Sequence, residues 1–166
     1  MILSATPTDA RAAIDFDQFF LEHHTRLIAC GTALTRDTER VRDAAQEALA
    51  RAFRDWSKVS LLDHPGAWVR RVFVNLLIDE GRRDSRRRAR VAAPQGHIDV
   101  SPSESPLLDA IRRLPTRQRT AIALHYIDDL SVDDVARVMG IATGTVKATL
   151  HHARGWLAVE LSGEPR

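Results

Sequence analysis

The sequence predicts an all-α protein made of two small helical domains joined by a flexible linker. Apolar residues recur at helical spacing through most of the chain. This periodicity stops at residues 91–105, VAAPQGHIDVSPSES, where proline, serine and glycine become frequent. A helix-turn-helix pattern follows this break. At about 3.3 Å per extended residue, such a linker could separate the two domains by up to roughly 50 Å.

Length and composition fit this organisation. A chain of 166 residues can form one or two small domains, and an apolar share of 44% is ordinary for a globular protein. The net charge of +2 says little about partners, so the distribution of charge matters more. We divide the chain into a lead-in at 1–14, a first domain at 15–90, the linker at 91–105, a second domain at 106–160 and a tail at 161–166.

Simple features exclude several classes of protein. The single Cys30 excludes an internal disulfide and a cysteine-based zinc cluster, and its helical context indicates a small core residue. The N-terminus lacks the basic start and apolar core of a signal peptide, and no apolar run approaches the length of a membrane span. We therefore expect a cytoplasmic protein without membrane insertion.

Two amphipathic helices begin the first domain. The first is expected over 15–34, and the second follows Thr35 and Asp37 and runs to about Trp56. Small residues on the second helix suggest close helix packing. The expected core side chains are Phe16, Phe19, Phe20, Leu27 and Leu34 of the first helix, with Val41, Ala44, Ala45, Ala48, Leu49, Ala52, Phe53 and Trp56 of the second.

The opposite face of the second helix is charged. Mixed acidic and basic residues usually form plain solvated surface, but the same face could dock on a partner, and the pattern alone does not decide. The residues of this face are Arg40, Asp43, Glu47, Arg51 and Arg54.

A loop at 57–66, which contains helix-stopping proline and glycine, leads into a third helix. At roughly 100° per residue, Trp68, Arg71, Asn75 and Arg82 fall within about 60° of one another on this helix. An aromatic ring, an amide and two guanidiniums in one stripe suit unpaired bases and their phosphates. Alternatively, Trp68 belongs to the core, and the pattern leaves both interpretations open.

The third helix ends in an arginine-rich run, GRRDSRRRAR, with six arginines against one aspartate between Arg82 and Arg90. Such a block attracts phosphate backbones through the release of counterions, although a solvated basic tail has the same composition.

The second domain carries a helix-turn-helix pattern. Two helices are expected at 106–114 and 117–127, beneath the motif. Ser131 is a favourable N-cap for the next helix, and Gly140 can adopt the left-handed conformation that ends it. Thr143 is then expected to cap a final helix, which could enter a DNA major groove.

The outward face of that final helix is basic and carries hydroxyl groups, with no acidic residue between Asp134 and Glu160. A helical hairpin buried in a larger bundle is the alternative, but this face suits DNA better. The hydrogen-bond donors on it are Thr145, Lys147, Thr149, His151, His152 and Arg154.

Blocks over nearly the whole chain resemble the extracytoplasmic-function (ECF, group IV) RNA polymerase sigma factors of the sigma-70 family. In the first domain they are DAAQEALARAF at 43–53 and HPGAWVRRVFVNLLIDEGRR at 64–83. In the second they are LLDAIRRLPTRQR at 107–119, LSVDDVARVMGIATGTVK at 130–147 and LHHAR at 150–154. The family has sigma-2 and sigma-4 domains and lacks the intervening domain of housekeeping sigma factors, which fits the short linker.

The resemblance implies a sigma factor that binds core RNA polymerase, directs it to promoters with −35 and −10 elements and helps to melt the −10 region. It implies four partners: the β′ clamp helices and the β flap of the polymerase, promoter DNA and an anti-sigma factor. The loop at 57–66 would capture a flipped base of the non-template strand. An extruded base costs a few kcal/mol, so it needs a prepared pocket.

The same resemblance assigns residues to each partner. The clamp helices would be faced by Asp43, Gln46, Glu47 and Arg51. The −10 DNA would be contacted by Lys58, His64, Trp68, Arg70, Arg71, Asn75, Arg82, Arg83, Arg86 and Arg87. The −35 DNA would be contacted by Arg119, Thr143, Thr145, Lys147, Thr149, His151, His152 and Arg154.

The chain departs from the family pattern at the −35 helix. After Lys147 the family often has Ser-Arg, where this chain has Ala148 and Thr149, and His152 stands where arginine is frequent. These replacements leave fewer cationic groups on this helix than the family pattern has.

Two other classes of protein compete with this interpretation. A stand-alone helix-turn-helix regulator is suggested by a likeness of the second domain to LuxR-type DNA-binding domains, but the blocks in the first domain argue against it. For an enzyme, the adjacent pairs His23-His24 and His151-His152 point to different helix faces, and no nucleotide-binding glycine loop or nucleophile constellation is present. We therefore expect no enzyme activity, no metal, no cofactor and no small-molecule substrate.

Overall fold

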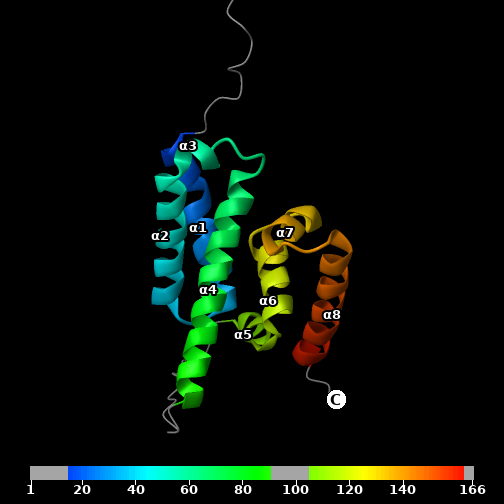
Figure 1. The fold of residues 1–166 in the computed structure, drawn as a ribbon. Coiled ribbons are helices and arrows are strands. Elements are labelled where there is room, and N and C mark those ends of the chain that lie inside the picture. The colour runs from blue at the N-terminus through cyan, green and yellow to red at the C-terminus, as the bar shows by residue number, and fades with distance from the viewer. Residues whose placement is uncertain (1–14, 91–104, 163–166) are drawn as a thin grey trace, which may run out of the picture.

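The structure is a computed structural model that describes residues 15–90 and 105–162, apart from the side chains of residues 80, 82 and 84–90. All regular elements in these ranges are helices, which confirms the expected all-α class. They form two groups that lie side by side, α1–α4 and α5–α8 (Figure 1). The lead-in at 1–14, the linker up to residue 104 and the tail from residue 163 lie outside the described residues.

The first domain is held together by the small residues of its second helix. Alanines at positions 44, 45, 48 and 52 are buried where this helix packs against its two long neighbours. Gly31 makes the same close approach from the first helix, because a Cβ there would lie 2.5 Å from Cγ1 of Val41 and 2.8 Å from Cζ of Phe73. The helices are α1 (Phe16–Leu34), α2 (Thr38–Arg54), α3 (Trp56–Val59) and α4 (Pro65–Arg90).

Three expectations for this domain need correction. Phe53 is 63% exposed instead of buried, and Phe20 is 37% exposed, because these positions lie near the open end of the α1–α2 packing. The segment 57–66 is only partly a loop, since α3 extends to Val59. Pro65 begins α4 and does not interrupt it, because proline fits the first turn of a helix, where its missing N–H has no partner to lose.

In the second domain, local capping signals set the helix boundaries as expected. The Ser105 side chain accepts a hydrogen bond from the Leu108 amide, and that of Ser131 accepts one from the Asp134 amide at 3.1 Å. Gly140 ends its helix with φ +66°. The elements are α5 (Pro106–Arg113), α6 (Thr116–Ile122), the π-helical segment η1 (Ala123–Ile127), α7 (Val132–Met139) and α8 (Thr143–Ser162).

The expected capping role of Thr143 is wrong. The amide of Val146 donates to the carbonyl of Ala142, so α8 already includes Thr143 as its first residue. The Thr143 hydroxyl donates instead to Oδ1 of Asp133 at 3.0 Å, which ties the start of α8 to α7.

The two domains pack against each other. Helix α1 contacts α5, α6 and η1 of the second domain, and α4 contacts α7. Figure 1 shows the second domain lying along one side of α1 and α4, with α2 on the far side. At this junction the second domain covers one face of α1 and of α4, whereas the outer face of α2 is turned to solvent.

Candidate polymerase and nucleic-acid interfaces

The charged face of α2 is open to solvent. Asp43 and Gln46 are exposed, while Glu47 and Arg51 are partly exposed. Glu47 accepts a hydrogen bond from Nε of Arg51 at 2.6 Å and lies 3.7 Å from Nη2 of Arg54. The hydrogen bond from Arg51 holds the pKa of Glu47 below its ordinary value. This face therefore presents ionised groups that no other part of the described chain covers.

An aromatic cluster borders the charged face at the C-terminal end of α2. The exposed ring of Phe53 lies with its centroid 4.9 Å from that of Phe16, which in turn lies 5.2 Å from Trp56. The sequence pattern assigned Phe53 to the core, so the exposure of this ring is a feature that only the structure reveals.

The stripe expected on α4 is only partly available to a ligand. Asn75 and Arg83 are exposed, and so are Lys58 and His64 before the helix. Trp68 is partly buried and packs against the hydrophobic core, so both of its possible roles retain support. The side chains of Arg82, Arg86 and Arg87 lie outside the described residues.

Two arginines near the start of α4 bind the second domain. Arg70 is 6% exposed, and its guanidinium donates from Nε and Nη2 to the two carboxylate oxygens of Asp128. Arg71 donates from Nε to the carbonyl of Val138 at 3.1 Å and from Nη2 to the carbonyl of Arg137 at 2.8 Å. Both guanidiniums are thus engaged within the chain, although sequence reasoning assigned them to −10 DNA.

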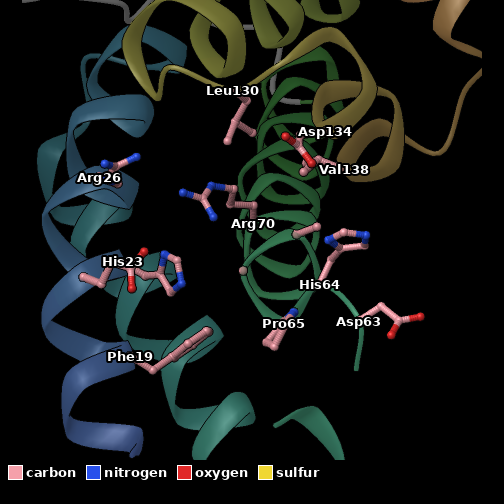
Figure 2. A pocket seen from close by; sticks show the side chains of 13 residues that line it. Phe19, His23, Arg26, Asp63, His64, Pro65, Arg70, Leu130, Asp134 and Val138 are labelled. Atoms are coloured by element: carbon pink, nitrogen blue, oxygen red, sulfur yellow. The ribbon is translucent and has the colours of Figure 1, made fainter. Parts of the chain in front are cut away.

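A cavity of about 370 Å³ lies at this junction, between α1, the start of α4 and α7. Figure 2 shows His23, His64 and Arg70 around it. The His23 side chain is buried, and its Nδ1 has no hydrogen-bond partner in the described part of the chain. Burial, together with the nearby positive charge of Arg70, lowers the pKa of His23 to about 4. The imidazole is therefore neutral near neutral pH.

The outward face of α8 is largely exposed. Thr145, Lys147, His151, His152 and Arg154 are all exposed. Among these five, Nη1 of Arg154 donates to the Tyr126 hydroxyl at 3.4 Å, and the rings of His151 and His152 lie edge to face with centroids 5.9 Å apart. The Thr149 hydroxyl donates to the carbonyl of Thr145 at 2.8 Å, one turn earlier in the same helix. Its proton is thus already used inside α8, which leaves an oxygen acceptor and a methyl group for DNA.

Arg119 does not lie on the α8 face. Its Nη1 donates to the carbonyl of Leu34, at the end of α1, at a distance of 2.7 Å. Burial lowers its pKa from the ordinary value. In this arrangement Arg119 serves the junction between the domains.

Two residues near these surfaces were missed by sequence reasoning. Tyr126 is 52% exposed beside Arg154, and Asp128 is buried as the partner of Arg70. Both belong to the end of the π-helical segment or follow it directly. Helical periodicity does not predict a π-helix, so it could not place these two residues. The signal in the sequence was a tyrosine and paired aspartates directly before the helix-turn-helix.

Comparison with known proteins identifies the class to which these two domains belong. The family described as sigma-70 region 2 matches residues 19–87, and the family described as sigma-70, region 4 matches residues 105–157. The first covers most of α1–α4 and the second covers α5–α7 and most of α8. The chain therefore has the two-part organisation of a sigma-70 protein.

Relatives narrow the class further. The chain is 31% identical over 150 residues to the ECF RNA polymerase sigma factor SigM of Mycobacterium tuberculosis, covering 86% of this chain and 75% of the relative. It is 30% identical over 138 residues to the ECF RNA polymerase sigma factor SigW of Bacillus subtilis, covering 72% and 74%. The chain belongs to the extracytoplasmic-function RNA polymerase sigma factors. It is a sigma factor that directs RNA polymerase to promoters, and the region 2 match disfavours a stand-alone regulator.

Solved structures share the fold. The sigma factor RpoE from Bartonella quintana, solved in complex with the anti-sigma factor NepR, matches with a TM-score of 0.76 and 23% identity over 91% of this chain and 99% of that chain. CnrH, solved with the cytosolic domain of CnrY, matches with a TM-score of 0.66 and 23% identity over 90% and 89%. At these identities the likeness supports the fold alone.

None of the helices at 16–90 and 106–162 is long and apolar enough to cross a membrane. In the same part of the chain, no group of three or more histidine, cysteine, aspartate or glutamate side chains is placed to hold a metal ion.

Proposed function

We propose that this sigma factor divides its work among three surfaces: α2 for polymerase, the start of α4 for melted −10 DNA, and α8 for −35 duplex. The observation that carries this proposal is the presence of both sigma regions, at 19–87 and 105–157, in one chain. The separate exposed faces of α2 and α8 add support, because each can meet its own partner without competing with the other.

The α2 face suits a protein partner with complementary charges. Asp43, Gln46, Glu47 and Arg51 offer two carboxylates, an amide and a guanidinium along two turns. Because the apolar side of α2 is already buried in the first domain, this face is free to bind without unfolding anything. The β′ clamp helices of core polymerase are its proposed partner.

The α4 region suits single-stranded DNA. Asn75 offers an amide for a base edge, Trp68 offers part of a ring for stacking, and Arg83 and Lys58 offer charges for phosphates. Arg70 and Arg71 would add two more cations once they are released from the second domain. The arginines at 82, 86 and 87 are proposed to continue the phosphate contacts.

The α8 face suits duplex DNA. Lys147 and Arg154 are seven residues apart, two helical turns, so they share one face of the helix. Thr143 and Thr145 stand at its N-terminal end, where helix-turn-helix proteins contact base edges. The remainder of the second domain is proposed to bind the β flap, which would hold α8 at the correct distance from the −10 region.

Run-off transcription with core polymerase on genomic fragments, followed by mapping of start sites, tests the proposal. The wild-type chain should give transcripts that start at a fixed distance from shared −35 and −10 elements. Replacing both Asp43 and Glu47 by arginine should abolish binding to core polymerase while leaving the circular dichroism spectrum and the melting temperature almost unchanged.

The matched control reverses two acidic residues elsewhere, Asp17 and Asp79, which are exposed and carry the same total charge. Polymerase binding at wild-type affinity by the α2 variant would show that the face is wrongly assigned. Equal loss in the control variant would show that net charge, and not this face, governs binding.

An anti-sigma factor is a further proposed partner. Of the structural neighbours cited above, RpoE was solved with the anti-sigma factor NepR, and CnrH with the cytosolic domain of CnrY. Co-purification of a protein that blocks run-off transcription by this chain would identify it.

A further inference from the structure

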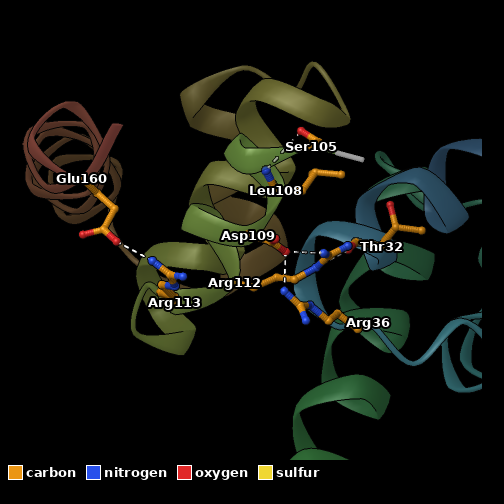
Figure 3. Close-up of polar contacts among 8 residues, drawn as sticks. All are labelled: Thr32, Arg36, Ser105, Leu108, Asp109, Arg112, Arg113 and Glu160. Carbon is orange, nitrogen blue, oxygen red and sulfur yellow. Dashed lines mark hydrogen bonds and ion pairs between the residues drawn. The ribbon is translucent and has the colours of Figure 1, made fainter. Parts of the chain in front are cut away.

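At one end of the junction between the domains, the arginines have acceptors within the chain. Arg112 donates to the carbonyl of Thr32 from Nε at 3.0 Å and from Nη2 at 2.6 Å, and to Asp109 at 3.1 Å (Figure 3). Arg119 donates to the carbonyl of Leu34. The last carbonyls of a helix have no partner within it, so these guanidiniums satisfy acceptors that would otherwise need water.

The cavity at the other end of this junction is different, because donors converge on it. Asp128 uses Nε and Nη2 of Arg70, so Nη1 is the nitrogen left for another acceptor. A Cβ at Gly66 would lie 2.7 Å from this Nη1 and 3.1 Å from Nε2 of His23. The two nitrogens, one from α4 and one from α1, thus lie beside the same point. An oxygen atom close to that point can accept a hydrogen bond from both.

The protonation of His23 decides which hydrogen-bond role it plays. The imidazole is neutral near neutral pH, so one ring nitrogen carries a hydrogen and the other a lone pair. Nδ1 is buried without a partner in the described part of the chain. A hydrogen on Nδ1 would stay unpaired, whereas a hydrogen on Nε2 lies where an acceptor in the cavity can reach it. We therefore assign the hydrogen to Nε2, which makes His23 a donor.

Arg26 supplies a third donor, from α1. Its side chain is 53% exposed, and its Nη1 lies 4.0 Å from Oδ1 of Asp128, which is beyond hydrogen-bond distance. Figure 2 shows Arg26 with His23 and Arg70 among the side chains that line the cavity. Three donors, two of them cationic, therefore border one cavity, and the group that satisfies them must be an acceptor.

The start of α4 favours the same kind of ligand. Residues 65–67 line the cavity and belong to the first turn of this 26-residue helix. The N-terminal end of a helix carries a partial positive charge, which stabilises an anion. The cavity volume of about 370 Å³ suits a small molecule.

Acidic groups limit how strongly such a ligand is held. Glu22, Asp63 and Asp134 also line the cavity, together with the imidazole of His64. Asp134 is already engaged, because Arg137 donates to it at 2.6 Å. The exposed carboxylate of Glu22 opposes the charge of Arg26 on the same helix, so we expect weak binding of one small anionic group.

We propose that this cavity binds a small oxyanion, a carboxylate or phosphate group, which accepts hydrogen bonds from His23, Arg26 and Arg70. The site is independent of the surfaces proposed for polymerase and DNA. Normal promoter-specific transcription by a chain that binds no anion would refute this site and leave the proposed function intact.

Nuclear magnetic resonance of the full-length chain tests the site. The probes are sulfate, which has the tetrahedral shape of a phosphate group, and acetate, which carries a carboxylate. Sodium chloride keeps the ionic strength constant during each titration. The ring signals of His23, identified by their loss in His23→Gln, should shift and reach saturation with at least one probe. The signals of His151 and His152 on α8 serve as internal controls. The absence of a saturable shift of His23 with both probes would overturn the proposal.

Two substitutions on the exposed face of α1 should act in opposite directions. Arg26→Gln should weaken binding of the probe about fivefold, and Glu22→Gln should strengthen it by a similar factor, because each changes one charge beside the cavity. The matched controls are Arg42→Gln and Asp17→Asn, which make the same charge changes at exposed positions that do not line the cavity. Equal effects in the variants and their controls would mean that net charge governs binding, and the site would be refuted.

Gly66→Ala tests the geometry, because its Cβ would occupy the point that Arg70 and His23 share. Binding of the probe should be lost, whereas Gly144→Ala, with nothing within 4 Å of the added Cβ, should bind it as wild type does. A folded Gly66→Ala chain with wild-type affinity would overturn the assignment to this cavity. If circular dichroism shows that Gly66→Ala does not fold, the opposite effects of Arg26→Gln and Glu22→Gln decide.

Discussion

Helices α4 and α8 are proposed to meet DNA in the two domains, yet the structure treats them differently. On α4, Arg70 and Arg71 are held by Asp128 and by the carbonyls of α7. On α8, Lys147 is exposed, and Arg154 makes a long hydrogen bond of 3.4 Å to the Tyr126 hydroxyl. The difference teaches that a basic residue on a DNA-facing helix is not necessarily available, because its own chain can be the first acceptor it meets.

The largest expected effect contrasts the packing of the two domains at glycine. Gly31→Ala should destabilise the chain by about 3 kcal/mol, because the new methyl would overlap Val41 and Phe73, which are buried and cannot easily move. Gly155→Ala in α8 should instead stabilise by about 1 kcal/mol, since nothing lies within 4 Å and alanine is the better helix former. Urea unfolding followed by circular dichroism measures both.

If both alanine variants shift the urea midpoint in the same direction, the contrast between a tightly packed first domain and an open α8 is wrong. The same m-value in all chains would confirm that only stability has changed.

The next effect concerns pH at the junction. The pKa of His23 is about 4 in the folded chain and near 6.5 in the unfolded chain. Burial lowers it most, followed by the positive charge of Arg70. Arg26 also lowers this pKa, whereas Glu22 and Asp128 raise it. Between these values the unfolded chain binds a proton that the folded chain does not. Stability should therefore be complete above pH 6.5 and fall by up to about 3 kcal/mol as the pH drops to 4.

Replacing His23 by glutamine should remove this part of the pH dependence, because glutamine does not titrate. Unfolding curves at several pH values compare the two chains. An identical slope in wild type and His23→Gln would mean that the histidine is not responsible.

A smaller effect should distinguish two residues of α8. Lys147→Ala should weaken binding to a −35 duplex by about 1 kcal/mol and lower the salt dependence by about one counterion, as expected for a phosphate contact. Thr149→Ala should change affinity less, because its hydroxyl donates to Thr145 within the helix. Fluorescence anisotropy over a salt series, with core polymerase present, measures both; a larger loss for Thr149→Ala would reverse the assignment.

The smallest expected effect lies where η1 leads to α7. Asp129 has φ +56°, a left-handed conformation that favours glycine. Asp129→Gly should therefore stabilise the chain by about 0.5 kcal/mol. Asp129→Asn tests the charge alone, because it removes the carboxylate charge and keeps a side chain of the same shape. A gain of the same size in both variants would attribute the effect to charge.

Local signals in the sequence predicted much of the fold correctly. Ser131 caps the start of α7 and Gly140 ends it, as expected, because capping depends on a few neighbouring residues. Thr143 and Phe53 were placed wrongly, because their surroundings depend on contacts between helices. The Thr143 hydroxyl is ten residues from its partner Asp133. Phe53 is 63% exposed and has its ring against Phe16, 37 residues earlier in the chain.

The candidate site was less accessible to sequence reasoning. Helical periodicity placed Arg71 and Asn75 on one stripe, but it carries no information about a partner 58 positions away, as Asp128 is from Arg70. The resemblance to sigma factors named the residues that would meet polymerase and DNA, and those assignments stay predictions. It did not reveal that three of them, Arg70, Arg71 and Arg119, contact the other domain.

The end of α1 has one more consequence. This helix has no basic residue in its last turn, so Arg112 and Arg119 of the second domain act as its external cap. If the domains separate, the carbonyls of Thr32 and Leu34 lose these hydrogen bonds and are hydrated instead. The last turn of α1 then frays more readily. Only three residues lie between this turn and the start of α2, the helix proposed to face polymerase. Amide hydrogen exchange in this turn therefore reports whether the two domains are together.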